Sequence, residues 1–339
     1  MNFTYFEPIY RPELNKIIQK RAFETKLGER IKTCNKNRSM EENLKISKAN
    51  YVIVGIPESI GIKANYGIEG AENAWAAFLQ YFLNIQSNEF FNGSNILIAG
   101  KFNFIDIENT AKNVINKKEK IETLRKLVAK MDDYIFPLIK CIVENNKIPI
   151  VIGGGHNNAF PCIKGAAMAL KLLHKIKYKS IDVVNLDAHA DFRPLEGRHS
   201  GNAFSYAFNA RFLNKYSVIG IDENYLTQYT IDQFKNNKNL RYITFESLQN
   251  SALLDLENKF NLSNFSNNFI GVEIDLDVIR NIHSSAETPV GIPVQQAILF
   301  VKKAANYNKI AYLHICEGAI YNNPLHSNNS KIGKLISYL

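Results

Sequence analysis

The feature that most limits the fold of this chain is a series of eight short strand-like runs separated by helical segments. Short, mainly apolar runs rich in β-branched residues are typical of strands that a protein covers on both faces. Strands that alternate with helices form parallel sheets, because each crossover helix packs back on the sheet. We therefore predict an α/β fold with a mostly parallel sheet. The eight runs are residues 51–56, 95–99, 148–152, 181–186, 217–221, 241–245, 269–274 and 310–315.

Helical periodicity fills most of the intervals between these runs. The longest case spaces apolar residues by threes and fours from Ile121 to Ile142, and Pro137 inside it should kink or divide the helix. A shorter helix is predicted after Pro12. We divide the chain into an N-terminal helical extension, residues 1–50, and a single α/β domain, residues 51–339. Further helices are expected at residues 70–83, from 158–161 onward, and at 226–236, 246–260 and 294–306.

Composition and charge exclude several kinds of partner. The formal net charge is +9, but the lysines are scattered among acids and no basic run is interleaved with aromatic residues, so we expect no nucleic-acid binding. The chain has no apolar run long enough to cross a bilayer, which requires about 18 residues, and we expect no membrane partner. The four cysteines lack CxxC spacing, which indicates reduced thiols and a cytoplasmic protein.

A cluster of charged residues interrupts the chain directly after the run 181–186. Side chains of an extended chain alternate between two faces, so Asp187, His189 and Asp191 project to one side. Two carboxylates and an imidazole on one side at the end of a strand favour a metal site. A hydrogen-bonded polar cluster in the core is the alternative, because buried carboxylates need partners of some kind.

Three other predicted strands end in similar polar breaks. The run 148–152 is followed by three glycines and His156, the run 269–274 by Asp275 and Asp277, and the last run by Glu317. In an open parallel sheet, ligands bind beyond the carboxyl ends of the strands, so we expect these side chains to meet at one edge. A glycine-rich phosphate loop is the rival interpretation, but no GK[ST] follows the glycines.

The charges of these residues predict a pair of divalent cations. Four aspartates carry four negative charges, and the two histidines supply one imidazole for each ion. A ligand set that is mostly oxygen suits Mn²⁺ better than Zn²⁺. Two metals about 3.5–4 Å apart would ionise a bridging water at neutral pH, so the residues predict hydrolysis. The expected ligands are His156, Asp187, His189, Asp191, Asp275 and Asp277.

The motifs GGGH, DAHAD and EIDLD, in this order, resemble those of the ureohydrolase superfamily, which includes arginase, agmatinase and formimidoylglutamase. The resemblance covers about residues 50–320. It implies a three-layer α/β/α sandwich with an eight-stranded, mostly parallel sheet, two Mn²⁺ ions per subunit held by the six expected ligands, and a trimer or hexamer. It also implies that Asp277 relays a proton and that Glu317 holds the nitrogens of an amidine or guanidine substrate.

Within this superfamily, the loop after the DAHAD motif is closest to formimidoylglutamase. Arginases carry Asn and a proton-shuttling His where this chain has Arg193 and Phe204. An arginine beside the metals can pair with a substrate carboxylate. An ion pair between Arg193 and Glu196 or another acid is the structural alternative, and His199 is a candidate replacement for the missing shuttle. The expected substrate contacts are Arg193, Arg198, Ser200, Asn202 and Asn65, with loop capping as the alternative for Ser200 and Asn202.

These features together predict hydrolysis of a formimidoyl or other amidine substrate. N-formimidoyl-L-glutamate, cleaved to L-glutamate and formamide, fits the predicted carboxylate contact best. A ureohydrolase of guanidino compounds would use the same metal ligands, and a catalytically silent family member acting as a binding subunit is a third alternative. The sequence leaves open whether Mn²⁺, Ni²⁺ or Co²⁺ is the working metal, and what residues 1–50 do.

Overall fold

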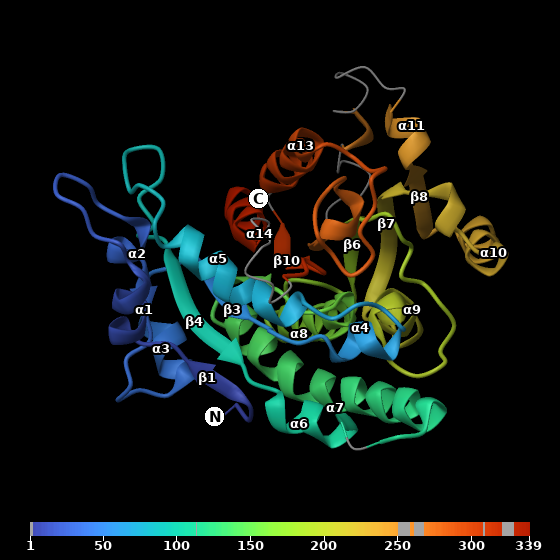
Figure 1. Cartoon of the computed structure of the whole chain (residues 1–339), viewed down its shortest axis with the longest axis horizontal. Coiled ribbons are helices and arrows are strands. Elements are labelled where there is room, and N and C mark those ends of the chain that lie inside the picture. The colour runs from blue at the N-terminus through green and yellow to red at the C-terminus, as the bar shows by residue number, and fades with distance from the viewer. Residues whose placement is uncertain (1–2, 113, 250–257, 261–267, 308, 321–328) are drawn as a thin grey trace.

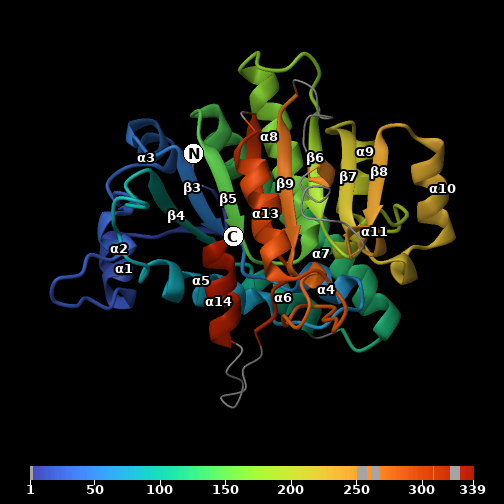
Figure 2. The same cartoon turned by 90° about the horizontal axis from the view of Figure 1, so that it is seen from above.

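A computed structural model describes residues 3–112, 114–249, 258–260, 268–307, 309–320 and 329–339. Its centre is one sheet, seen in Figures 1 and 2, with the strand order β1-β4-β3-β5-β10-β9-β6-β7-β8. Strand β2 adds to this sheet by pairing with β4. The strands are β1 (Phe6–Pro8), β2 (Lys32–Thr33), β3 (Tyr51–Gly55), β4 (Ile96–Phe102), β5 (Ile148–Ile152), β6 (Ile181–Leu186), β7 (Leu213–Ile221), β8 (Leu240–Thr244), β9 (Ile270–Asp275) and β10 (Ile310–Cys316).

The eight predicted runs are the eight strands from β3 to β10, and these strands pair with one another in parallel. The prediction of a mostly parallel sheet is therefore confirmed. The sheet also contains two short strands that were not predicted, both from the first 50 residues. β1 pairs antiparallel with β4, and β2 pairs parallel with it. The division into an extension and one domain stays a prediction, but the first 50 residues are not only helical.

Helices cover both faces of the sheet. They are α1 (Arg11–Ile17), α2 (Leu27–Arg30), α3 (Met40–Ile46), α4 (Ile60–Ala64), α5 (Ala74–Phe82), α6 (Ile105–Lys112), α7 (Lys117–Glu144), α8 (Ala159–Leu172), α9 (Ala203–Asn209), α10 (Gln228–Asn236), α11 (Phe245–Gln249), α13 (Val294–Ala305) and α14 (Asn329–Tyr338). Figure 2 shows α13 and α14 on the face of the sheet opposite α8. Short 3-10 turns, among them η2 (His156–Asn158), η3 (Ser200–Asn202), η4 (Glu223–Tyr225) and η6 (Leu276–Val278), follow several strands and loops.

The period-two pattern of the strands explains why both faces are apolar. On β3, Val52 and Val54 pack into a core with residues of α7 and α8, whereas Ile53 packs into a second core with residues of α5, α13 and α14. Strand β3 therefore buries successive side chains in opposite cores. The result is a three-layer α/β/α sandwich, as the resemblance implied.

Several predicted helices differ in detail from those of the structure. The helix predicted after Pro12 is α1, which begins at Arg11 and ends at Ile17; Phe23, beyond its end, is fully exposed with a positive φ of 63°. Pro137 lies inside α7 and does not divide it, because the helix continues to Glu144; the alternative of a kink stays a prediction. The predicted helix 246–260 corresponds to α11 at its start, and part of it lies outside the described residues.

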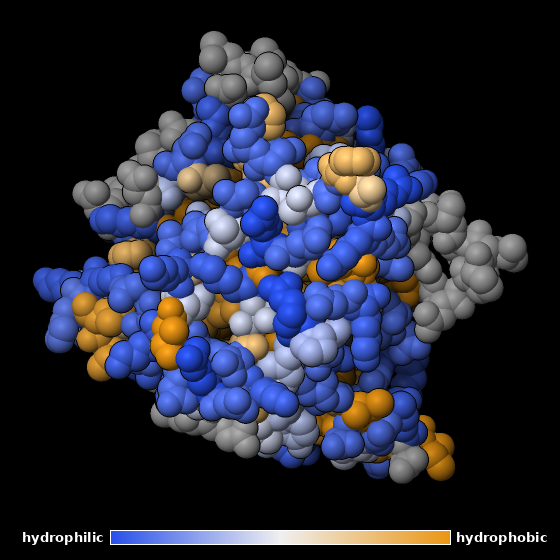
Figure 3. Space-filling model, turned by 90° about the vertical axis from the view of Figure 1, so that its left-hand side faces the viewer, coloured by the Kyte–Doolittle hydropathy of each residue, from blue (hydrophilic) through white to orange (hydrophobic). Residues whose placement is uncertain are grey.

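The surface is mainly hydrophilic on the side that carries the N-terminal segment. Figure 3 shows apolar residues there as separate patches rather than one continuous band. Among the described residues, no helix combines the length and the apolar character that a membrane span requires.

Candidate active site

The four polar breaks meet at one edge of the sheet. Strands β5, β10, β9 and β6 are neighbours in the sheet and run parallel, so their carboxyl ends lie side by side. His156 begins η2 after β5, Glu317 follows β10, Asp275 ends β9, and Asp187 follows β6. The expectation that these side chains gather at one edge is therefore met by the geometry.

Local backbone geometry presents the ligands toward one another. The carboxylate of Asp187 accepts a hydrogen bond from the backbone N–H of His189 at 2.7 Å, and Asp275 accepts one from the N–H of Asp277 at 2.8 Å. Each aspartate thus caps the residue two positions later and fixes the direction of both side chains. Before His156 the chain turns at Gly154, where φ is +77° and a Cβ atom would lie 2.6 Å from the carbonyl oxygen of Ile56.

The six expected ligands form two adjoining groups. Nδ1 of His156 lies 3.2 Å from Asp187 Oδ2, 2.9 Å from Asp191 Oδ2 and 3.1 Å from Asp275 Oδ2. Nδ1 of His189 lies 3.6 Å from Asp187 Oδ1 and 3.7 Å from Asp277 Oδ2. Each group contains one imidazole, and Asp187 presents one oxygen to each group. This arrangement suits a pair of neighbouring cations.

The electrostatics of the cluster also fit divalent cations. Burial and the neighbouring carboxylates raise the pKa of Asp275, and burial raises the pKa of Asp191 and Asp277 as well. Burial opposes a charge on His189, but Asp187, Asp277 and Asp191 raise its pKa to about 10. Such a concentration of buried carboxylates requires positive charge to stay ionised. Within the described residues, neither ring nitrogen of His156 has a hydrogen bond of normal geometry; Nδ1 faces the aspartates, as expected for an atom that binds an ion, and Nε2 faces the carboxylate of Glu273.

A cavity of about 400 Å³ opens beside this cluster. Glu317 lines it, with Oε1 accepting a hydrogen bond from the backbone N–H of His156 at 2.6 Å. Its Oε2 is buried and has no hydrogen-bonding partner among the described residues. Burial and the nearby Asp277 raise the pKa of Glu317 to about 8. A buried carboxylate oxygen without a partner is suited to a cationic or N–H-rich ligand.

Arg193 lines the same cavity and has an exposed side chain. The carboxylate of Glu196, its predicted alternative partner, is occupied elsewhere. Oε1 of Glu196 lies 3.5 Å from Nη2 of Arg125 and 3.1 Å from Nε2 of His199. In the part of the chain that the structure describes, the Arg193 guanidinium forms no ion pair. Two other expected contacts, Asn65 and Ser200, also line the cavity and lie 3.3 Å apart, joined by a hydrogen bond.

Two expected substrate contacts lie outside the cavity, and we correct both. Arg198 is buried between α7 and the loop that follows β6. Its guanidinium donates hydrogen bonds to Asp132 at 2.8 Å and to the carbonyl of Asn157 at 2.8 Å. It also lies over the ring of Phe160, 4.8 Å from the ring centroid. Asn202 accepts from Arg198 at 2.9 Å and donates to the carbonyl of Gly197 at 2.7 Å. Protein groups use the hydrogen-bonding capacity of both side chains, which therefore hold the loop.

The structure also tests the two positions linked to the missing proton shuttle. Phe204 is buried and stacks on Tyr216, with 4.3 Å between the ring centroids. It also makes a T-shaped contact with the ring of His156, with 5.1 Å between centroids, so it packs beneath the expected ligands. His199 is buried outside the cavity; its Nδ1 accepts from the N–H of Gly201 at 3.1 Å, and its Nε2 faces Glu196. Burial and the surrounding arginines lower the pKa of His199 to about 3, so it is neutral. It does not replace the shuttle.

Sequence reasoning missed several residues that contact the expected ligands, among them Tyr225 and Glu273. The ring of Tyr225 in η4 stacks on His189 with 4.7 Å between centroids and also lines the cavity. Glu273 on β9 is fully buried, with Oε2 3.5 Å from Nε2 of His156. The period of two could have identified Glu273, because it lies two residues before Asp275 and faces the same side. No local pattern marks Tyr225.

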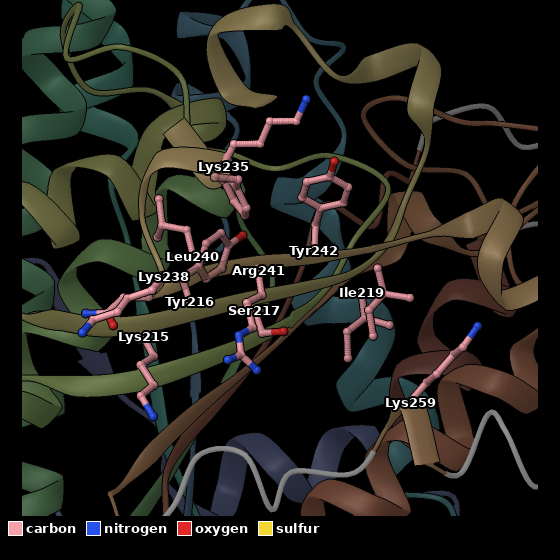
Figure 4. Close-up of a pocket in the computed structure, with 13 residues that line it drawn as sticks. Lys215, Tyr216, Ser217, Ile219, Lys235, Lys238, Leu240, Arg241, Tyr242 and Lys259 are labelled. Carbon is pink, nitrogen blue, oxygen red and sulfur yellow. The ribbon is translucent and has the colours of Figure 1, made fainter. Parts of the chain in front are cut away.

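A second cavity of similar volume lies at strands β7 and β8. Its lining contains Lys215, Lys235, Lys238, Arg241 and Lys259 but no histidine or carboxylate among the described residues, so it offers no comparable metal site. Figure 4 shows Lys235 pointing away from Lys215 and Arg241. Because these charges do not converge, we assign no ligand to this cavity.

Structures of known proteins share this fold. Formimidoylglutamase from Bacillus subtilis superimposes with a TM-score of 0.72 at 18% identity, over 94% of this chain and 92% of that one. Trypanosoma cruzi formiminoglutamase, solved with Mn²⁺, superimposes with a TM-score of 0.66 at 19% identity, over 93% and 95% of the two chains. These likenesses establish the arginase-like α/β/α architecture.

The sequence places the chain within a family. It belongs to the arginase family, whose model matches residues 49–330. Among curated proteins it is similar to the formimidoylglutamase of Streptococcus gordonii, with 25% identity over 234 residues. That match covers 67% of this chain and 63% of the length of the relative. The resemblance read from the three motifs is therefore confirmed at the level of the family.

Proposed function

We propose that this protein is a hydrolase that uses two divalent cations, most simply Mn²⁺, to cleave a C–N bond of an amidine that carries a carboxylate. The proposed substrate is N-formimidoyl-L-glutamate, and the products are L-glutamate and formamide. One observation carries the proposal: the Arg193 guanidinium, which forms no ion pair with any described residue, and the Glu317 oxygen, which has no described hydrogen-bonding partner, line the same cavity as the cluster of acids. The cavity thus offers one group for a carboxylate and another for an amidine.

The proposed roles follow from the positions of the side chains. His156, Asp187, His189, Asp191, Asp275 and Asp277 would hold the two cations, which would supply a hydroxide nucleophile at neutral pH. Glu317 would accept N–H bonds from the formimidoyl group and so orient its carbon. Asp277 would take the proton from the hydroxyl group added to the formimidoyl carbon and pass it to the departing glutamate nitrogen as the C–N bond breaks.

Arg193 would determine which amidines bind. Its guanidinium can form two parallel hydrogen bonds to a carboxylate, and it would repel the cationic tail of a substrate such as agmatine. Asn65 and Ser200, which line the same wall, would contribute polar contacts. The names of the relatives agree with this proposal, since several of them are formimidoylglutamases.

A panel of substrates tests the proposal. The Mn²⁺-loaded protein should release glutamate and formamide from N-formimidoyl-L-glutamate, and little urea from arginine, agmatine or 4-guanidinobutyrate. Urea from a guanidino acid without release of glutamate would instead establish a guanidino-acid hydrolase. No product from any compound, with well under two metal ions per chain after loading, would favour the catalytically silent alternative.

A further inference from the structure

A buried polar layer lies one step below the expected metal ligands in the centre of the sheet. His314 on β10, Glu273 on β9 and Asn185 on β6 are paired in register and are all fully buried. Asp275 and Asp187 follow two residues after Glu273 and Asn185, so both aspartates extend from the same face. Polar side chains this deep in a parallel sheet are costly and need a physical reason.

Glu273 is the central residue of this layer. Its Oε1 accepts a hydrogen bond from the hydroxyl of Tyr312 at 2.6 Å, and its Oε2 accepts one from Nδ1 of His314 at 2.7 Å. The same Oε2 lies 3.5 Å from Nε2 of His156. Gly271 makes room for this arrangement, because a Cβ atom there would lie 2.4 Å from the ring of Tyr312. The carboxylate is thus held by two donors and directed at a third.

The position of this carboxylate determines how His156 presents its ring. An ionised carboxylate only accepts hydrogen bonds, so the imidazole nitrogen that faces it must carry the proton. A neutral His156 then has its proton on Nε2 and its lone pair on Nδ1. Nδ1 is the atom that faces Asp187, Asp191 and Asp275. Ligand histidines in metalloproteins commonly donate their second N–H to a carboxylate in this way.

The layer supports a second ligand from its other end. Asn185 donates to Asp187 Oδ2 at 2.9 Å and to the hydroxyl of Tyr216 at 3.0 Å, and that hydroxyl donates to the carbonyl of Ala190 at 2.9 Å. Asn185 therefore holds the carboxylate of Asp187, whereas Glu273 acts on the ring of a histidine, His156. Replacement of Glu273 should therefore affect the His156 side of the cluster more than the His189 side.

We propose that Glu273 is a positioning residue, held by Tyr312 and His314, that fixes the ring of His156 with Nδ1 free for the cation on that side. The inference rests on the proposed metal centre but not on the identity of the substrate. It adds to the six ligands a carboxylate that contacts no substrate and acts only through His156.

The test is Mn²⁺ binding by the Glu273→Gln variant, measured by calorimetry and by electron paramagnetic resonance. The amide has almost the same shape but presents only one acceptor oxygen to the three donors. We expect affinity at one of the two sites to fall by about 10- to 100-fold, the range for carboxylates behind ligand histidines. At a Mn²⁺ concentration that fills both wild-type sites, the variant should show the signal of a single uncoupled ion.

Asp182→Asn provides the matched control. Asp182 is also a buried carboxylate in this sheet, on β6, but its Oδ1 accepts from Asn214, Asn268 and the N–H of Lys215 instead of facing a ligand. This variant should bind both ions with wild-type affinity. Equal losses of metal affinity in the two variants would show a general effect of neutralising a buried acid and would overturn the proposal.

Two further outcomes separate this inference from others. Wild-type affinity at both sites in Glu273→Gln would also overturn it. If that variant does not fold, Tyr312→Phe removes one of the two anchoring bonds and keeps the ring, and it should weaken the same site several-fold; unchanged binding would then overturn the proposal. These experiments measure metal affinity, so a wrong assignment of the substrate would leave their results unchanged. A wild-type chain that binds no pair of metal ions would refute the proposed function itself.

Discussion

At the scale of single residues, Arg193 gives the most specific information on the substrate. It is the only arginine among the described residues that line the cavity, and it forms no ion pair there. Replacement by alanine should therefore affect binding of the carboxylate end and not the reacting carbon.

The Arg193→Ala variant should raise KM for N-formimidoyl-L-glutamate by about 10- to 100-fold, the loss of one bidentate charged pair, with a small change in kcat. Steady-state kinetics measures both constants. The control is formamidine, an amidine without a carboxylate, whose turnover should be the same in both proteins. An unchanged KM for the acidic substrate would remove Arg193 from the binding site.

His199 should make stability depend on pH. Its pKa in the folded protein is lowered to about 3 from an ordinary value of 6.5. Below pH 6.5 this histidine binds a proton in the unfolded chain but stays neutral in the folded protein. Its contribution to the free energy of unfolding is therefore fully present above pH 6.5 and is lost as the pH falls. Between pH 7.5 and pH 5 this residue should account for on the order of 2 kcal/mol.

Chemical unfolding of His199→Asn at these two pH values measures this contribution. Asparagine can still accept the hydrogen bond from the N–H of Gly201, so the loop should keep its shape. The unfolding free energy of the variant should change less with pH than that of the wild type. An identical pH dependence would show that His199 is protonated in the folded protein.

At the scale of elements, the loop after β6 depends on α7. Arg198 and Asp132 form a buried pair between them, with the guanidinium also held by Asn202 and the carbonyl of Asn157. Burial raises the pKa of Asp132 to about 6, although Arg198 lowers it. This contact positions the segment that carries Arg193 and Ser200 at the cavity.

Single replacements Asp132→Leu and Arg198→Met should each destabilise the protein by about 3–5 kcal/mol, because each leaves one charge buried without its partner. The double variant should lose much less than the sum of the two. A double-mutant cycle from urea unfolding measures the difference. Additive losses would mean that the two side chains act independently.

The elements also show how far the sequence allowed prediction. Strands β3 to β10 were predictable because burial on both faces requires continuous apolar residues, and the edge that gathers the acids follows from parallel pairing. The strands β1 and β2 have three and two residues, too few for a recognisable period. The structural role of Arg198 was hidden because its partner Asp132 is 66 residues away in the sequence.

At the scale of the whole molecule, the acids at the sheet edge should couple metal binding to stability. Four buried carboxylates, Asp187, Asp275, Asp277 and Glu317, and the partly buried Asp191 crowd the ends of four central strands, so removal of cations should leave their repulsion uncompensated. Chelation should lower the midpoint of thermal unfolding by roughly 5 °C or more, since each bound ion at 100 times its Kd contributes about 2.7 kcal/mol. Calorimetry with EDTA, followed by added Mn²⁺, measures this effect; Asp191→Asn should respond less to Mn²⁺ than the wild type.

The most direct test of the central claim, a two-metal centre at the carboxyl edge of the sheet, is an anomalous-difference map from crystals saturated with Mn²⁺. We expect two peaks about 3.5–4 Å apart. One should lie beside Nδ1 of His156 and the other beside Nδ1 of His189, with Asp187 between them. A single peak, or no peak within coordinating distance of these two histidines, would contradict the account.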